Sequence, residues 1–161
     1  MQIITLGDEV LRKKALPIAE IDASLVAFAN EMIESMRIGR GVGLAGPQVS
    51  ALLRIFVTEI DGDKARVFIN PSIIETSPEL SEYEEGCLSI PGMYADVQRP
   101  SQLRVQAWNE RGRPFTIDAD GMLARVILHE YDHLEGTLFI DRLSEAKREK
   151  LLSLYEKRKR A

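Results

Sequence analysis

The segment HEYDH, residues 129–133, contains both histidines of the chain. On an α-helix, residues four apart lie on the same face, so His129 and His133 can direct two imidazole groups at one metal ion. Glu130 lies about 100° around the helix from His129, beside such an ion, where it can act as a general base on metal-bound water. The motif therefore predicts a metal-dependent hydrolase. The alternative is a surface helix that contains two histidines without any chemistry.

A catalytic metal site usually has three protein ligands and an open position for water. The chain has no third histidine, so the third ligand is Cys87, its single cysteine, or a carboxylate. Cys87 lies in EEGCLSIPG, where Gly86 frees the backbone before the thiol, and Pro91 and Gly92 are expected to end the segment. A buried structural cysteine is the alternative. A set of one Cys and two His suits Fe²⁺, Zn²⁺, Co²⁺ or Ni²⁺ and does not identify the ion.

The composition favours one globular domain over residues 1–161, because 45% of the residues are hydrophobic. A net charge of -4 gives no general electrostatic case for nucleic-acid binding, so direct DNA binding is not expected. The N-terminus lacks the apolar run of a signal peptide, and no stretch is long enough to cross a membrane. We therefore expect a cytoplasmic protein without membrane contact.

Hydrophobic periodicity predicts the elements that must position the motif. Residues 22–37 form an amphipathic helix with Asp22 as N-cap, and a second helix begins at Asp120 and carries HEYDH. Alternating patterns predict two hairpins, one formed by residues 54–60 with 65–70 and the other by residues 102–108 with 113–118. Residues 39–50 are rich in Gly and Pro and are expected to be an irregular loop with unusual backbone conformations.

The charged tail, residues 144–161, is expected to be a C-terminal helix. Strands followed by one long helix indicate an α+β fold rather than alternating βαβ units. We therefore predict antiparallel sheets packed around a central helix that carries HExxH in the C-terminal half, with one N-terminal and one C-terminal helix.

Three blocks, GVGLAGPQ (41–48), EGCLS (85–89) and HEYDH (129–133), together resemble the motifs of the peptide deformylase family, in order and at familiar separations. The resemblance covers essentially the whole chain. It implies an enzyme that removes the formyl group from the N-terminal methionine of nascent polypeptides and releases formate.

The resemblance also implies roles for individual residues. Cys87, His129 and His133 would hold one divalent metal ion, with Fe²⁺ the expected native ion and Zn²⁺, Ni²⁺ or Co²⁺ possible in preparations. Glu130 would take a proton as metal-bound water attacks the formyl carbon and pass it to the leaving amine. Catalysis would also use hydrogen bonds to the oxyanion of the tetrahedral intermediate, from the side chain of Gln48 and the backbone N–H of Leu88.

By the same resemblance, one wall of a substrate cleft would be formed by Gly41, Val42, Gly43 and Leu44. Gly43 and the strand around Glu85 and Gly86 would pair with the peptide backbone. Val126 would line the methionine pocket, with Met122 and Arg125 at its rim; a core Val126 and a solvated Arg125 are the alternatives. Gly46 and Leu128 depart from the usual alanine and glutamine of the family, and Gly46 is expected to loosen the loop that positions Gln48.

Two other functions remain open. An HExxH metallopeptidase would take its third ligand downstream of the motif, for example from Glu135. A non-catalytic, metal-stabilised protein would dock to the ribosome through the basic tail, a contact that is also a theme of the deformylase family. The expected partners are N-formylmethionyl nascent peptides, with the ribosome as a further candidate, and a monomer is expected.

Overall fold

The computed structural model of the chain describes residues 1–160, so the last residue of the expected C-terminal helix, Ala161, lies outside the described part. A five-stranded antiparallel sheet has the order β1 (Gly43–Ala45), β2 (Ile55–Thr58), β3 (Arg66–Thr76), β6 (Gln102–Trp108) and β7 (Pro114–Asp120). A second, two-stranded sheet contains β4 (Leu80–Cys87) and β5 (Ile90–Pro100). The helices are α1 (Ala23–Ile38), α2 (Gly121–Leu134) and α3 (Glu145–Arg160), and the 3₁₀ turns are η1 (Glu9–Arg12), η2 (Gly46–Val49) and η3 (Phe139–Arg142).

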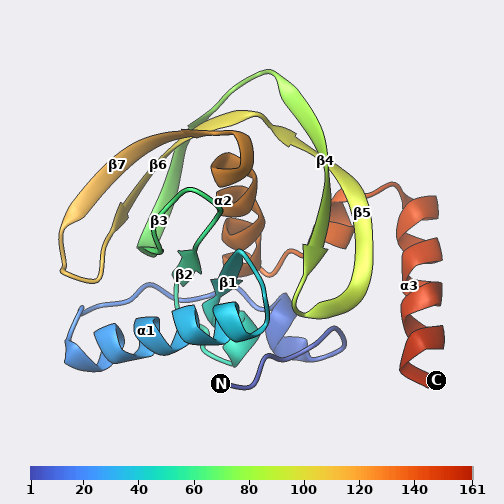
Figure 1. The fold of residues 1–161 in the computed structure, drawn as a ribbon, viewed down its shortest axis with the longest axis horizontal. Coiled ribbons are helices and arrows are strands. Elements are labelled where there is room, and N and C mark those ends of the chain that lie inside the picture. Colours follow the sequence, from blue (N-terminus) through green and yellow to red (C-terminus); the bar gives the residue numbers. More distant parts are fainter. Residues whose placement is uncertain (161) are drawn as a thin grey trace.

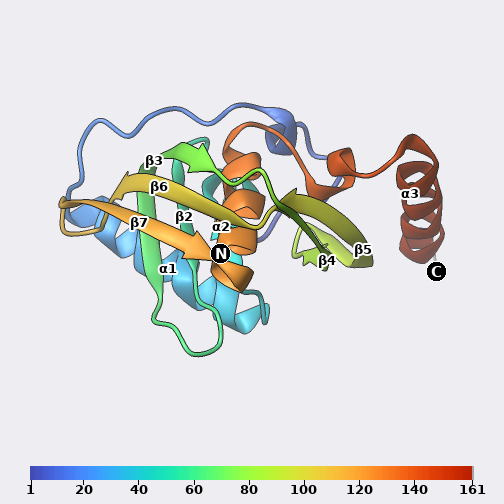
Figure 2. The same ribbon diagram turned by 90° about the horizontal axis from the view of Figure 1, so that it is seen from above.

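Helix α2 runs through the middle of the molecule, between the five-stranded sheet and the β4–β5 hairpin (Figure 1, Figure 2). Its apolar residues Ala124, Ile127 and Leu134 pack with Phe56 of β2 and Val105 of β6 in a buried cluster. The predicted α+β fold with a central HExxH helix is confirmed. The two predicted hairpins are also confirmed, as β2–β3 and β6–β7.

Helix α1 forms as its sequence predicts. The side chain of Asp22 accepts a hydrogen bond of 2.9 Å from the backbone N–H of Leu25 and caps the first turn. Met32 and Met36 are fully buried against strands β1 and β2. The helix therefore covers the face of the sheet opposite to α2 and supports β1, which forms one wall of the site.

The prediction of an irregular loop over residues 39–50 was wrong for most of that segment, which forms β1 and η2. Positive φ angles do occur, but at Arg40 and Ser50 and not at the glycines. A Cβ on Gly46 would lie 2.7 Å from the carbonyl oxygens of both Ala51 and Leu53. Gly46 therefore allows two backbone segments to pack tightly, which argues against a loosened loop.

The expectation that Pro91 and Gly92 end a segment was also wrong, because β5 begins at Ile90 and continues to Pro100. The pairing shifts at this point: Gly86 pairs with Tyr94, whereas Cys87 pairs with Ile90. The extra residues of β5 form a bulge, which increases the local twist and redirects the strand. This irregularity lies next to Cys87 and directs its thiol toward α2.

Helix α3 lies beyond β5 at the edge of the molecule (Figure 1). Its Leu151 and Tyr155 are buried in a cluster with Ile90 and Val97 of β5. Within residues 1–160, none of the helices has both the length and the apolar character that crossing a membrane requires.

Candidate metal centre and active-site cleft

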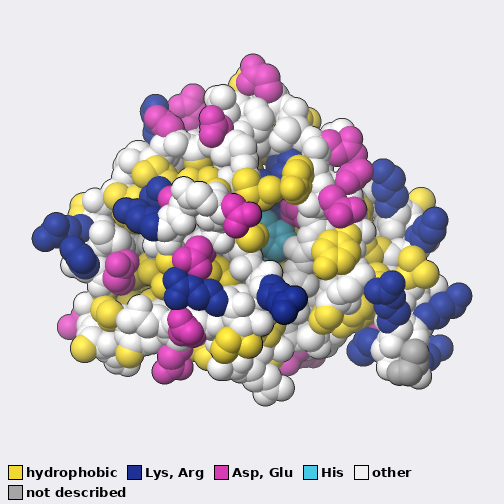
Figure 3. All heavy atoms as spheres, in the orientation of Figure 1, with side chains coloured by type: hydrophobic (Ala, Val, Ile, Leu, Met, Phe, Trp, Pro, Cys, Tyr) yellow, Lys and Arg dark blue, Asp and Glu magenta, His cyan; other side chains and the backbone are white. Residues whose placement is uncertain are grey.

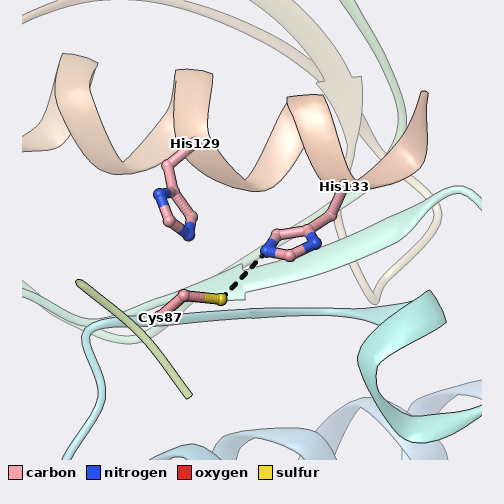
Figure 4. A group of neighbouring side chains, drawn as sticks. All are labelled: Cys87, His129 and His133. Atoms are coloured by element: carbon pink, nitrogen blue, oxygen red, sulfur yellow. Dashed lines mark hydrogen bonds between the residues drawn. The ribbon is translucent and has the colours of Figure 1, made fainter. Parts of the chain in front are cut away.

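Three potential metal ligands converge between the two sheets. His129 and His133 extend from successive turns of α2, and Cys87 approaches them from the end of β4 (Figure 4). One donor atom from each of the three residues lies within 4.8 Å of the other two, and the Cys87 Sγ is 3.4 Å from the His133 Nε2. Both histidine side chains are buried. The arrangement can hold one small cation.

Glu85 fixes the orientation of His129. The Glu85 carboxylate lies 2.9 Å from the His129 Nδ1, so the Nε2 of that ring is the atom left for the metal site. Burial by itself would raise the pKa of Glu85, but hydrogen bonds from His129 and Arg99 outweigh burial and lower the pKa to about 2. Glu85 is therefore a carboxylate under all ordinary conditions and accepts the Nδ1–H of His129.

The Glu85 carboxylate is the centre of a buried ionic network. Arg99 donates to both of its oxygens, at 2.6 and 3.0 Å, and Arg125 donates to one of them at 2.7 Å. Arg99 also donates to Asp132 at 2.9 Å, and Arg142 binds the same Asp132 carboxylate at 2.8 and 3.1 Å. Since every charge has a partner of opposite sign, the network offsets the cost of burial and holds β4, β5 and α2 together.

Glu130 is buried beside the candidate ligands, and its Oε2 lies 3.9 Å from the His129 Nε2. Its Oε1 has no hydrogen-bond partner within residues 1–160. Burial raises the pKa of Glu130 to about 7, with smaller and opposing effects from the neighbouring charges. A carboxylate of this pKa can exchange a proton near neutral pH.

The absence of a side chain at Gly43 leaves room for the side chain of Glu130. A Cβ on Gly43 would lie 2.5 Å from the Glu130 Oε2 and 2.9 Å from two carbons of the same side chain. Only glycine allows β1 to approach the carboxylate so closely, which explains a glycine in a short buried strand.

The side-chain amide of Gln48 is held in one orientation. Its Oε1 accepts a hydrogen bond of 2.9 Å from the backbone N–H of Ala45, so its Nε2 must face the opposite way. That Nε2 lies 3.0 Å from the Ser89 Oγ and 3.5 Å from the Cys87 Sγ. An amide donor therefore points at the candidate metal centre, and Leu88 lies in the adjoining turn between β4 and β5.

A cleft of about 580 Å³ opens onto these residues. Figure 3 shows it as a hollow near the centre of the molecular face, with a histidine at its base and hydrophobic side chains around it. The exposed hydrophobic residues that line it are Val42, Tyr83, Tyr94 and Met122. The shape and the apolar lining suit an extended peptide with an apolar first side chain.

The predicted substrate-binding residues are placed as follows. Gly41, Val42, Gly43, Glu85, Gly86, Met122, Arg125 and Val126 line the cleft. Leu44 does not, because its side chain is fully buried in the cluster beneath α1, and its assignment to the cleft wall is corrected. Arg125 is not a solvated charge: it is buried and donates to Glu85, to the Val97 carbonyl and to Ser81.

Four further residues of the site were not predicted from the sequence: Arg99, Asp132, Arg142 and Ser89. Asp132 lies inside HEYDH and Ser89 inside EGCLS, so the motifs themselves contained a signal for these two. The sequence around Arg99 contains no feature that distinguishes it from an ordinary surface arginine. It joins the network because β5 runs antiparallel to β4 and brings it back beside Glu85.

These residues fit a divalent metal ion. Burial disfavours a charged His129, yet Glu130, Cys87 and Glu85 outweigh burial and raise its pKa well above the usual value. These groups thus favour a positive charge at the centre, either a proton on His129 or a cation that takes its place. Burial lowers the pKa of His133 well below the usual value, so this ring is neutral and offers a lone pair. One thiol and two imidazoles are common ligands of divalent transition metals.

Comparisons with known proteins identify the family of this chain. The family model described as polypeptide deformylase matches residues 1–149. A peptide deformylase of Treponema pallidum is 48% identical over 155 residues, covering 96% of this chain and 95% of the relative. A peptide deformylase of Clostridium botulinum is 51% identical over 139 residues, covering 86% of this chain and 93% of the relative.

Solved structures give the same result. The crystal structure of a peptide deformylase from Legionella pneumophila is 42% identical and superposes with a TM-score of 0.92, covering 98% of this chain and 94% of that one. A peptide deformylase from Synechococcus elongatus, crystallised in complex with actinonin, is 40% identical with a TM-score of 0.90, covering 94% and 85% of the two chains. This chain belongs to the polypeptide deformylase family.

Proposed function

We propose that Cys87, His129 and His133 together hold one divalent metal ion and that Glu130 moves the protons of the reaction. As a member of the family, the chain is an enzyme that removes the N-formyl group from the N-terminal methionine of nascent polypeptides. The convergence of the three donor atoms within 4.8 Å, next to a buried carboxylate, is the observation that supports these roles. Fe²⁺ is our proposal for the native ion.

A divalent ion bound here supplies a Lewis acid that polarises the formyl carbonyl and makes a water molecule more acidic. Glu130 accepts a proton from the attacking water and delivers it to the amide nitrogen as the C–N bond breaks. Its free Oε1 and its pKa of about 7 suit both transfers. The products are formate and a peptide with a free amino terminus.

The negative charge that develops on the formyl oxygen needs fixed hydrogen-bond donors. We assign this role to the Nε2 of Gln48 and the backbone N–H of Leu88. The hydrogen bond from Ala45 to the Gln48 Oε1 holds the amide in place, so it need not reorient during the reaction. Val126 and Met122 provide apolar surface for the methionine side chain, and Gly43 and Gly86 line the part of the cleft assigned to the peptide backbone.

Formate release tests this assignment directly. We expect formate from formyl-Met-Ala-Ser with protein that is loaded with iron and kept free of oxygen, and with nickel-loaded protein in air. The same protein should not cleave the acetyl-capped peptide at an internal bond. Folded, metal-loaded protein that releases no formate would contradict the proposal.

The metallopeptidase alternative requires Glu135 as third ligand, and the structure gives it no support. The Glu135 carboxylate is bound to Arg54 at 2.8 Å, at the end of α2. Loss of a residue that only supports a ligand typically weakens metal binding by about 10- to 100-fold. Because Cys87 is proposed to be a ligand itself, Cys87→Asp should weaken metal binding by more than this. Glu135→Gln should leave it unchanged. Competition with a chromogenic chelator measures both affinities, and the reverse order would favour the peptidase.

We also propose that α3 contacts the ribosome. Its exposed basic residues include Lys147, Lys150 and Lys157, which can pair with phosphate groups. Deleting residues 147–161 would be a poor test, because it would remove the buried Leu151 and Tyr155 and unfold part of the core.

Glutamine at the three exposed lysines is the better change. We expect weaker co-sedimentation with ribosomes, a reduced dependence of binding on salt, and unchanged hydrolysis of formyl-Met-Ala-Ser. Lys64→Gln, in the turn between β2 and β3, is the matched control. Binding that survives the triple substitution would exclude α3 as the contact.

We further propose that residues 1–161 act as one catalytic domain and as a monomer in the cytoplasm. The three candidate ligands, Glu130 and the cleft lie together within residues 1–160, which supports a site formed by a single chain.

A further inference from the structure

Arg40 has a backbone conformation that arginine rarely adopts, with a φ of 58°. It follows Gly39, the C-cap of α1, in a Schellman motif: its N–H donates to the Arg37 carbonyl at 3.0 Å, and the Gly41 N–H donates to the Met36 carbonyl at 2.9 Å. Glycine is the usual residue at this position because it is free of strain there. Strained residues at the edge of a site often have a functional role, so the side chain of Arg40 needs an explanation.

The guanidinium of Arg40 is an exposed positive charge on the cleft wall without a carboxylate partner in residues 1–160. The carboxylates of Glu34, six residues earlier in the chain, and of Glu59, whose N–H donates to the Val42 carbonyl, are both bound to Arg37. The other arginine of the cleft, Arg125, is buried and bound to Glu85. Of the two arginines that line the cleft, Arg40 is thus the one that is free to bind a negatively charged group of a substrate.

The position of Arg40 along the wall indicates which part of a substrate it meets. Gly43 lies against Glu130, at the reacting end of the cleft. Arg40 is three residues away along a segment that includes a turn, so the two residues are at most about 10 Å apart. A peptide that leaves the reacting end along this wall brings its second or third residue beside Arg40.

We propose that Arg40 determines substrate specificity by favouring an acidic side chain at the second or third residue of the formylated peptide. This inference rests on the proposed function. The interaction is exposed to solvent, so its effect is modest: we expect kcat/KM to favour Asp over Lys at one of these positions by about fivefold. The preference should disappear in about 1 M salt, where the Debye length is about 3 Å.

The test compares formyl-Met-Asp-Ala with formyl-Met-Lys-Ala, and formyl-Met-Ala-Asp with formyl-Met-Ala-Lys. Arg40→Asn removes the charge with a residue that tolerates positive φ, and should reduce the Asp preference to about one. Arg40→Lys should keep the preference. The matched control is Glu84→Gln, which changes the exposed charge on the facing wall and should not lower the preference for Asp.

Arg40→Gly separates specificity from a structural role. An arginine near the end of a helix also interacts favourably with the helix dipole, and loss of that effect would lower Tm without changing the ratio of two substrates. Relief of backbone strain should bring the Tm of Arg40→Gly to the parent value or above it, while the Asp preference is lost. Equal Asp-to-Lys ratios in the parent and in Arg40→Asn, at both positions, would overturn the proposal. Failure to cleave the neutral formyl-Met-Ala-Ser would instead contradict the proposed function.

Discussion

Replacing Glu130 with glutamine should lower kcat for formate release by about 10²- to 10⁴-fold, the usual contribution of a general acid–base group. Glutamine has nearly the same shape, so it should still pack over Gly43, but it cannot accept a proton from water. Initial rates on formyl-Met-Ala-Ser, with metal content measured on the same samples, check this expectation.

The stability of this variant should not fall. Glu130 is a buried carboxylate with an unpartnered oxygen among the described residues, and a neutral amide is easier to bury than a charge. We expect a Tm equal to or above that of the parent and an unchanged metal content. Glu135→Gln, the same change one turn later on the surface, is the matched control and should keep full activity. An active Glu130→Gln variant with metal bound would exclude Glu130 as the proton carrier.

Replacing Glu85 with glutamine should have the largest effect on stability. The carboxylate accepts hydrogen bonds from Arg99, Arg125 and His129, and an amide offers one acceptor oxygen and no negative charge. Removing one partner of a buried ion pair costs about 3–5 kcal/mol, because the remaining charge stays buried. Urea unfolding of the metal-free proteins measures this loss without any contribution from the ion.

The same substitution should weaken metal binding by about 10- to 100-fold, since His129 loses the group that orients its ring. Glu84→Gln is a close control: the residue is the neighbour of Glu85 in β4, but its side chain is exposed. It should change neither the free energy of unfolding nor the metal affinity. Equal stability of the two variants would show that the network around Glu85 contributes little to folding.

Much of the fold was predictable because its elements have strong local signals. The helical stripe after Asp22 and the alternating pattern of residues 102–108 each indicate a buried face of defined period, and the turn DGDK marks the link of a hairpin; the structure contains all three elements. The errors came where local signals mislead. Glycines in residues 39–50 suggested an irregular loop, whereas they are needed for close contacts with Glu130 and with neighbouring backbone.

The prediction that Pro91 and Gly92 end a segment failed for a related reason. Proline and glycine usually end a strand, but a bulge in β5 accommodates both, and the pairing resumes at Tyr94. Leu44 shows the limit of residue-by-residue transfer from a family motif. It lies within GVGLAGPQ, yet strand alternation turns its side chain into the core instead of the cleft.

By itself the sequence determined the type of chemistry. The sequence contains two histidines four residues apart with a glutamate between them, and one cysteine in EGCLS. These residues are potential metal ligands and a potential base, because helical spacing fixes the relative directions of the two histidines and the glutamate. Only the tertiary structure decided that Cys87 lies next to the histidines, that Glu85 and Arg99 form a buried network behind His129, and that Arg40 is left free at the cleft. These relations join residues that are far apart in the chain, and strand pairing and burial establish them; no local pattern encodes which distant charges will meet.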